Sequence, residues 1–140
     1  MHAKDAPATT VSIAGEEDII TARGSARDVA KALGFGAVDQ SRIATAVSEL
    51  ARNVVRYATD GRGTTEIRTL EGADGRTGIE ITVHDDGPGI ADVERALSEG
   101  FTSGNGMGMG LPGARRLMDE MEIDSVLGRG TRVTIRKWRR

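Results

Sequence analysis

Three short stretches of the chain carry residue types that can do chemistry, and the first is SELARNVVRYA at positions 48–58. Glu49 and Asn53 lie four residues apart, so on a helix their side chains stack on one face. A carboxylate beside an amide oxygen can serve a hard cation such as Mg²⁺, and the carboxylate can also accept a proton from an attacking hydroxyl. The alternative is a solvated helix face with a Glu–Arg contact, since Arg56 lies close to the same line.

The second stretch is HDDGPGI at positions 84–90, where an apolar strand ends in two aspartates and a Gly-Pro-Gly sequence. An aspartate at a strand end, facing a cleft, can accept a hydrogen bond from an exocyclic amine such as that of adenine. Glycines there allow the backbone to approach a flat ring closely. The alternative is a plain turn, because Asp-Gly and Pro-Gly are common turn dipeptides.

The third stretch is rich in glycine, with five glycines between positions 104 and 113, directly before a predicted helix. Backbone N–H groups at a helix N-terminus bind phosphate without any basic side chain. An ordinary flexible loop is the alternative. GMGLPG at 108–113 formally matches a dinucleotide-binding fingerprint, but it lacks the preceding strand and the acidic residue about 20 positions further on. No P-loop motif occurs in the chain.

Hydrophobic periodicity predicts the elements that must position these stretches. We expect helices over 16–33, 38–57, 92–100 and 112–121, with Pro112 at the first position of the last one, and strands over 9–15, 64–70, 78–85, 122–127 and 131–138. A hairpin loop joins the second and third strands, which makes them antiparallel. The order predicts an α+β fold, a two-layer sandwich with helices on one face of a mixed, mostly antiparallel sheet. We expect a disordered lead over 1–8 and one domain over 9–140.

Composition limits the classes of partner. The 140 residues carry a net charge of −2, which gives no basis for broad affinity for nucleic acid or anionic membranes. The polar start MHAKDAPATT predicts no secretory signal, and no apolar run approaches the roughly 20 residues needed to span a bilayer. The absence of cysteine excludes disulfides and thiolate metal sites and fits a reducing compartment. We therefore expect a cytoplasmic protein with no nucleic-acid or membrane partner.

The three stretches together, in this order and spacing, resemble the Bergerat ATP-binding fold of the GHKL superfamily. The resemblance covers roughly residues 40–135 and includes GRGT at 128–131. Gyrase, Hsp90 and MutL use further domains, and since we expect a single domain here, we do not expect one of these types. Neither His2 nor His84 fits the phospho-accepting histidine of a histidine kinase. LGFGAVDQSRIATAVSELARN, DDGPGI, GLPGARRLMDEMEIDSV and IRKW are similar to the RsbT-type serine/threonine switch kinases of the stressosome, which are related to anti-sigma factors.

The resemblance implies an activity and a set of partners. It implies a protein kinase that transfers the γ-phosphate of ATP to a serine or threonine of a STAS-domain partner. After release, such a kinase binds and activates a PP2C-type phosphatase. The alternative is an anti-sigma factor that sequesters a sigma subunit and phosphorylates its antagonist, and a non-catalytic ATP sensor is a third possibility. The oligomeric state stays open, a homodimer included.

Carried over position by position, the resemblance also assigns roles in catalysis and phosphate binding. Glu49 would be the general base for the incoming hydroxyl, and Asn53 would ligate the Mg²⁺ that bridges the phosphates. The phosphate-side lid would consist of three glycines, Gly106, Gly108 and Gly110. Since no lysine is obvious in this set, Mg²⁺ is expected to supply much of the positive charge.

The same resemblance assigns an adenine pocket. Asp85 would bind the adenine amino group, Gly87 and Gly89 would shape the pocket, and Thr131 would support the base through water. Arg56 departs from the pattern of these kinases, which is apolar at that position. We expect Arg56 to lie at the surface.

Overall fold

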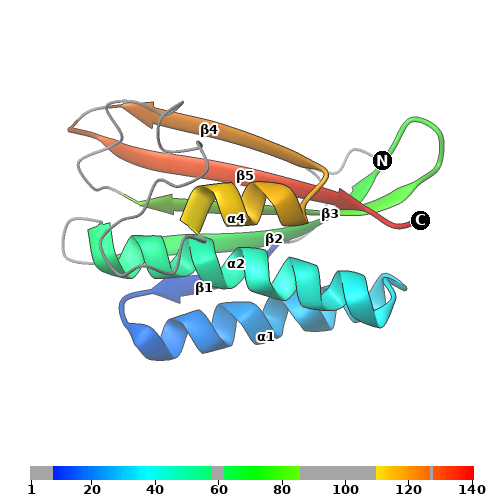
Figure 1. Cartoon of the computed structure of the whole chain (residues 1–140), viewed down its shortest axis with the longest axis horizontal. Helices are drawn as coiled ribbons and strands as arrows, with labels where there is room; N and C mark the ends of the chain where they lie inside the picture. The colour runs from blue at the N-terminus through cyan, green and yellow to red at the C-terminus, as the bar shows by residue number, and fades with distance from the viewer. Residues whose placement is uncertain (1–7, 58–61, 86–109, 127) are drawn as a thin grey trace.

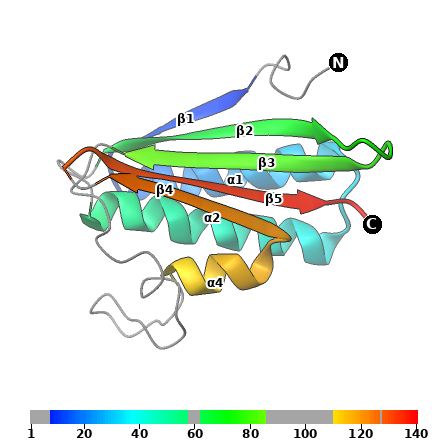
Figure 2. The ribbon, with the colours of Figure 1, turned by 90° about the horizontal axis from the view of Figure 1, so that it is seen from above.

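The computed structural model describes residues 8–57, 62–85, 110–126 and 128–140 (Figure 1). Its elements, in chain order, are β1 (Thr9–Ile13), α1 (Glu16–Ala32), α2 (Ala37–Tyr57), β2 (Gly63–Glu71), β3 (Thr77–Asp85), α4 (Gly110–Leu117), β4 (Glu120–Val126) and β5 (Gly130–Trp138). The strands form one sheet in the order β1-β2-β3-β5-β4. The helices lie on one face of it (Figure 2).

This architecture confirms the predicted two-layer α+β sandwich. All four described strand pairings are antiparallel, so the part of the sheet that the structure describes is not mixed. The helix predicted over 92–100 and most of the predicted lead, residues 1–7, lie outside the described residues.

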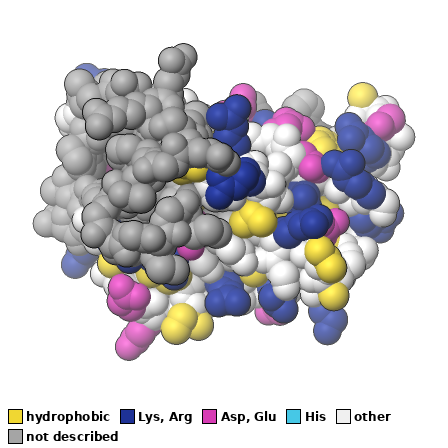
Figure 3. All heavy atoms as spheres, in the orientation of Figure 1, with side chains coloured by type: hydrophobic (Ala, Val, Ile, Leu, Met, Phe, Trp, Pro, Cys, Tyr) yellow, Lys and Arg dark blue, Asp and Glu magenta, His cyan; other side chains and the backbone are white. Residues whose placement is uncertain are grey.

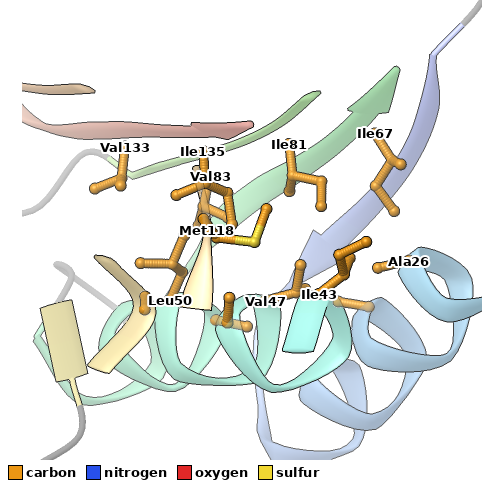
Figure 4. Close-up of a cluster of buried hydrophobic side chains, with 14 of the residues drawn as sticks. Ala26, Ile43, Val47, Leu50, Ile67, Ile81, Val83, Met118, Val133 and Ile135 are labelled. Atoms are coloured by element: carbon orange, nitrogen blue, oxygen red, sulfur yellow. The ribbon is translucent and has the colours of Figure 1, made fainter. Parts of the chain in front are cut away.

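The helices pack through the apolar stripes that the sequence predicts. On α2, Ile43, Val47 and Leu50 are buried, and they point toward Ile81 and Ile135 of the sheet (Figure 4). The opposite face of the sheet carries polar and charged side chains, because alternate residues of a strand point to opposite faces. Burial of one apolar layer between helices and sheet therefore fixes which strand positions face the site.

The start of α1 illustrates local sequence control. Its first turn holds three acidic residues, which favour the positive end of the helix dipole. The Asp18 carboxylate accepts hydrogen bonds from the N–H groups of Ala14 at 2.7 Å and Gly15 at 3.1 Å. These bonds satisfy donors that would otherwise have no partner in the helix.

Helix α4 differs from its prediction at both ends. It begins at Gly110, so Pro112 is its third residue rather than its first. Proline is tolerated there because the first N–H groups of a helix have no intrahelical partner. The helix ends at Leu117, where Lys137 Nζ donates to the Leu117 carbonyl at 2.9 Å. The last two residues of the predicted helix, Glu120 and Met121, belong to β4, which begins at Glu120 rather than at residue 122.

The described surface carries charges of both signs. Where Figure 3 shows described side chains, lysine and arginine are interspersed with aspartate and glutamate rather than gathered in one patch. Ile20 and Val38 are the large hydrophobic side chains that stand out into solvent in the described part of the chain. Among the described helices, none combines the length and the apolar character that crossing a bilayer requires.

Candidate functional site

Glu49 lies on α2 between buried neighbours, and its side chain is only 12 % exposed. Arg52 Nη1 donates to Glu49 Oε1 at 2.8 Å, and the backbone N–H of Gly110 donates to Glu49 Oε2 at 3.2 Å. Both carboxylate oxygens are therefore held, one by a guanidinium and one by a peptide group. Such charge-assisted hydrogen bonds fix the orientation of the carboxylate.

The contact with Gly110 brings together two stretches that are 61 residues apart in the sequence. Gly110 is the first residue of α4, so its N–H lies at the positive end of that helix. Its φ of +40° is in the left-handed region, where glycine avoids the Cβ clash that other residues suffer. One glycine of the glycine-rich stretch therefore lies directly beside the predicted base.

The arginine beside Glu49 is Arg52, whereas Arg56 is exposed, as expected. Residues three apart on a helix are neighbours, so the Glu49–Arg52 spacing alone could have indicated this ion pair. Sequence analysis missed Arg52, and with it a cation in the site. The structure therefore adds an arginine beside the candidate base to the set of residues that the resemblance indicated.

Asn53 follows Glu49 by one helical turn and is partly buried. Its amide oxygen and the Glu49 carboxylate are oxygen donors, the chemistry that Mg²⁺ prefers. In the described part of the chain, no three His, Cys, Asp or Glu side chains group together in a way that could hold a metal ion. The donor set fits an ion that a nucleotide brings with it, because Mg²⁺ is commonly bound through one or two protein ligands plus substrate phosphates.

A second group of polar side chains lies at one end of the sheet. Asp85 of β3 is directly opposite Thr131 of β5, and Thr131 is directly opposite Ser125 of β4. On its other side, Asp85 is directly opposite Gly63 of β2. These residues share the helix-facing side of the sheet, since they keep the same alternation as the buried Val83.

Gly63 lets the start of β2 lie close to both α2 and the end of β3. A Cβ at position 63 would lie 2.5 Å from the His84 carbonyl oxygen, 2.9 Å from Val54 Cγ1 and 3.3 Å from Asp85 Cβ. Only glycine allows this close approach. Val54 directly follows Asn53, so the start of β2 packs against the part of α2 that carries Asn53.

The two groups of polar residues occupy the same end of the molecule. Figure 1 shows the second half of α2, the start of α4, the end of β3 and the start of β5 together on the left. The Thr65 hydroxyl, on the strand beside Asp85, is fully buried and has no hydrogen-bond partner among the described atoms. A buried hydroxyl without a partner is costly. It is a polar group that a bound base or its water would satisfy.

Four predicted site residues cannot be placed in this arrangement. Gly87, Gly89, Gly106 and Gly108 lie outside the described residues. Of the predicted site, the structure brings Glu49 together with Gly110, and Asp85 together with Thr131. Sequence analysis missed Arg52, Gly63, Thr65 and Ser125.

His84 alternates with Asp85 on β3 and lies on the opposite face of the sheet, where its Nε2 is 3.3 Å from Glu66 Oε1. Burial raises the pKa of Glu66, but hydrogen bonds and charge from Arg68 and His84 more than offset this and hold that pKa below its ordinary value. This pair therefore belongs to the ionic network of the open face and not to the candidate site.

Comparison with known proteins shows the family of the chain. Residues 14–137 match the family model described as the histidine kinase-like ATPase domain. The serine/threonine-protein kinase RsbT of Bacillus subtilis is 48 % identical over 130 residues, which cover 93 % of this chain and 96 % of that protein. An anti-sigma F factor of Caldanaerobacter subterraneus is 37 % identical over 100 residues, which cover 69 % of this chain and 68 % of that protein.

Solved structures share the fold at lower identity. The structure of the RsbU and RsbW domains of a Mycobacterium tuberculosis protein matches with a TM-score of 0.64 at 24 % identity, over 96 % of this chain and 33 % of that one. The mycobacterial sensor histidine kinase MprB matches with a TM-score of 0.56 at 19 % identity, over 96 % of this chain and 99 % of that one. The chain therefore belongs to the histidine kinase-like ATPase domain family and, within it, to the RsbT-type serine/threonine-protein kinases.

Proposed function

We propose that this kinase transfers the γ-phosphate of ATP to a serine or threonine of a STAS-domain partner, and that after release it binds and activates a PP2C-type phosphatase. The observation that carries this proposal is the 48 % identity to a serine/threonine-protein kinase along nearly the whole of both chains. The contact between Glu49 and Gly110 supports the location of the site, because it joins a candidate base to a helix N-terminus.

In this proposal, α2 and α4 handle the transferred group. The acceptor hydroxyl oxygen attacks the γ-phosphorus, the bond to the β-phosphate oxygen breaks, and ADP leaves. Glu49 takes the hydroxyl proton as the general base. The N–H groups at the start of α4, with Gly106, Gly108 and Gly110, hold the phosphates. Phosphoryl transfer depends mainly on positioning and on charge neutralisation, so the fixed orientation of Glu49 contributes more than its basicity does.

Positive charge comes from two sources in this proposal. Mg²⁺, when bound through Asn53 and the phosphates, neutralises charge on the phosphate oxygens. Arg52 supplies a second cation beside Glu49. At the other end of the site, Asp85 accepts from the adenine amino group, Thr131 supports the base, and Gly87 and Gly89 shape the pocket.

A transfer assay with γ-labelled ATP and the STAS-domain proteins encoded beside this kinase tests the proposal. We expect the unmodified kinase to place label on one of these proteins. The Asn53→Ala variant is expected to lose Mg-ATP binding. The Glu49→Ala variant is expected to transfer phosphate slowly while it still binds its partner. Absence of label on every STAS protein would favour a non-catalytic ATP sensor instead. Transfer at near-normal rates in Asn53→Ala would overturn the metal assignment.

The second candidate function is an anti-sigma factor that binds a sigma subunit directly. The 37 % identity to an anti-sigma F factor favours it. Both candidates share the nucleotide site, so ATP binding does not separate them. Co-purification does: recovery of a sigma subunit and RNA polymerase would favour the anti-sigma factor, and recovery of a PP2C-type phosphatase would favour the switch kinase.

A further inference from the structure

The three strands β3, β5 and β4 meet at the candidate adenine pocket. They share one pattern of residues on their helix-facing side. Two apolar residues are followed by one polar residue toward the same end of the sheet. The series are Ile81, Val83 and Asp85 on β3, Ile135, Val133 and Thr131 on β5, and Met121, Ile123 and Ser125 on β4. The polar members occupy one cross-strand row, with Thr131 in the middle. Ser125 is therefore part of this polar row although no role has been assigned to it above.

The Ser125 hydroxyl lies within hydrogen-bond distance of two groups of β5. Its Oγ lies 3.0 Å from Thr131 Oγ1 and 3.3 Å from the carbonyl oxygen of Gly130. A hydroxyl has one hydrogen, and a carbonyl oxygen only accepts. Both bonds form together only when Ser125 donates to Gly130 and accepts from Thr131.

This arrangement fixes what Thr131 presents to a ligand. Because its hydrogen is given to Ser125, Thr131 Oγ1 offers lone pairs to a neighbouring group. Asp85, directly across the strand pair, also offers only lone pairs as a carboxylate. Two adjacent acceptors match a group with two hydrogens, such as an exocyclic amine or a water molecule that bridges it to Thr131, and they disfavour a carbonyl oxygen at the same place.

We propose that Ser125 is a specificity-determining residue, which orients the Thr131 hydroxyl so that the pocket selects a 6-amino purine over a 6-oxo purine. The inference rests on the proposed function, because it takes the base to lie at Asp85 and Thr131. Ser125 acts through Thr131 and is a positioning residue. Its loss frees the Thr131 hydrogen to donate to a 6-oxo group.

The test compares binding of ATP and of inosine triphosphate, whose base carries oxygen in place of the amine. The unmodified kinase is expected to prefer ATP by about a hundredfold or more, as sites built around a hydrogen bond do. Ser125→Ala is expected to weaken ATP binding about three- to tenfold and to reduce the ATP preference by about tenfold. Ser125→Thr keeps the hydroxyl and is expected to restore both values.

Two further measurements separate orientation from a general structural effect. Thr131→Val removes the hydroxyl at nearly constant shape, and adding Ser125→Ala to it is expected to change the ATP preference no further. Thr134→Val is the matched control, because the Thr134 hydroxyl of β5 lies 3.3 Å from the Thr82 hydroxyl of β3 on the open face of the sheet. It is expected to leave the ATP preference unchanged.

The outcomes distinguish the inference from the proposed function. If Asp85→Asn and Thr131→Val both bind ATP normally, the base does not lie at this row, and the assigned pocket and the inference fall together. If these two variants lose ATP affinity while Ser125→Ala keeps the full ATP preference, only the inference is overturned. Additive effects of Ser125→Ala and Thr131→Val would also overturn it.

Discussion

The backbone N–H of Gly110 donates to Glu49 Oε2 at 3.2 Å, so one glycine of the glycine-rich stretch is bonded to the predicted base. The same peptide N–H, at the start of α4, is also a predicted phosphate ligand. A carboxylate and a phosphate are both anions, and either one suits the positive end of a helix. In the structure described here, the carboxylate occupies that end, and Arg52 holds its other oxygen.

Removing the guanidinium beside Glu49 is expected to slow phosphoryl transfer. Arg52→Gln takes away the 2.8 Å bond to Glu49 Oε1, so the carboxylate loses one of its two fixed partners. We expect single-turnover transfer to fall about three- to tenfold, the range of one partly exposed charge-assisted bond. Arg56→Gln is the control, because Arg56 lies on the same helix and is exposed. Equal rates in the two variants would show that Arg52 does not position Glu49.

A side chain at position 63 is expected to destabilise the fold. Gly63→Ala places a Cβ 2.5 Å from the His84 carbonyl and 2.9 Å from Val54 Cγ1, so the strand must shift away from the helix. We expect the free energy of unfolding to fall by about 2 kcal/mol in urea denaturation.

Gly24→Ala is the matched control for that experiment. Position 24 is in the middle of α1, and a Cβ there meets nothing within 4 Å. Alanine is a better helix former than glycine, so we expect a gain of about 0.5–1 kcal/mol. A loss of stability in Gly24→Ala as large as that in Gly63→Ala would contradict the assignment of the effect to close approach.

Gly110→Ala is expected to weaken ATP binding while the fold stays near native. Its φ of +40° costs a non-glycine residue about 1–2 kcal/mol, so the first turn of α4 should shift and move the N–H away from Glu49 and the phosphates. Gly15→Ala is a control with extended backbone and open space around the added Cβ. Isothermal titration with Mg-ATP measures the effect, and unchanged affinity in Gly110→Ala would make the glycine-rich stretch an ordinary loop.

Stability is expected to fall at acid pH partly through Asp119, which joins the end of α4 to β5. Burial raises the pKa of Asp119, but the Trp138 N–H, Arg140 and Lys137 more than offset this, and the pKa lies below its ordinary value of 3.8. A lowered carboxyl pKa stabilises the fold above pH 3.8, and this contribution is lost as the pH falls through the folded-state pKa.

The variant Asp119→Asn is expected to lose about 1 kcal/mol at pH 7 and to approach the parent protein in stability below pH 3.8. Unfolding in urea at pH 7, 5 and 3 measures this difference. A difference in stability that stays constant from pH 7 to pH 3 would contradict a role for the Asp119 charge.

The sequence alone predicts those parts of the fold that show a periodic pattern of apolar residues along one element. The apolar stripe of α2 and the alternation of β3 were readable because each is a repeat along one element, and both lie where they were predicted. Helix α4 was predicted with the wrong ends, since its C-terminus is set by Lys137, which comes from a strand 20 residues away. The periodicity of residues 112–121 gives no information about a contact with a residue so far along the chain.

Some features of the candidate site were likewise predictable from the sequence, and others were not. Residue types and spacing by themselves identified Glu49 with Asn53 as a candidate pair, and the family resemblance indicated Asp85 and Thr131. Only the tertiary structure decided that Glu49 is bonded to Gly110, that Gly63 lets β2 lie close to α2 and to the end of β3, and that Ser125 bonds to Thr131. Strand register and helix packing create these contacts. Register is a property of paired strands, and no single stretch of sequence contains it.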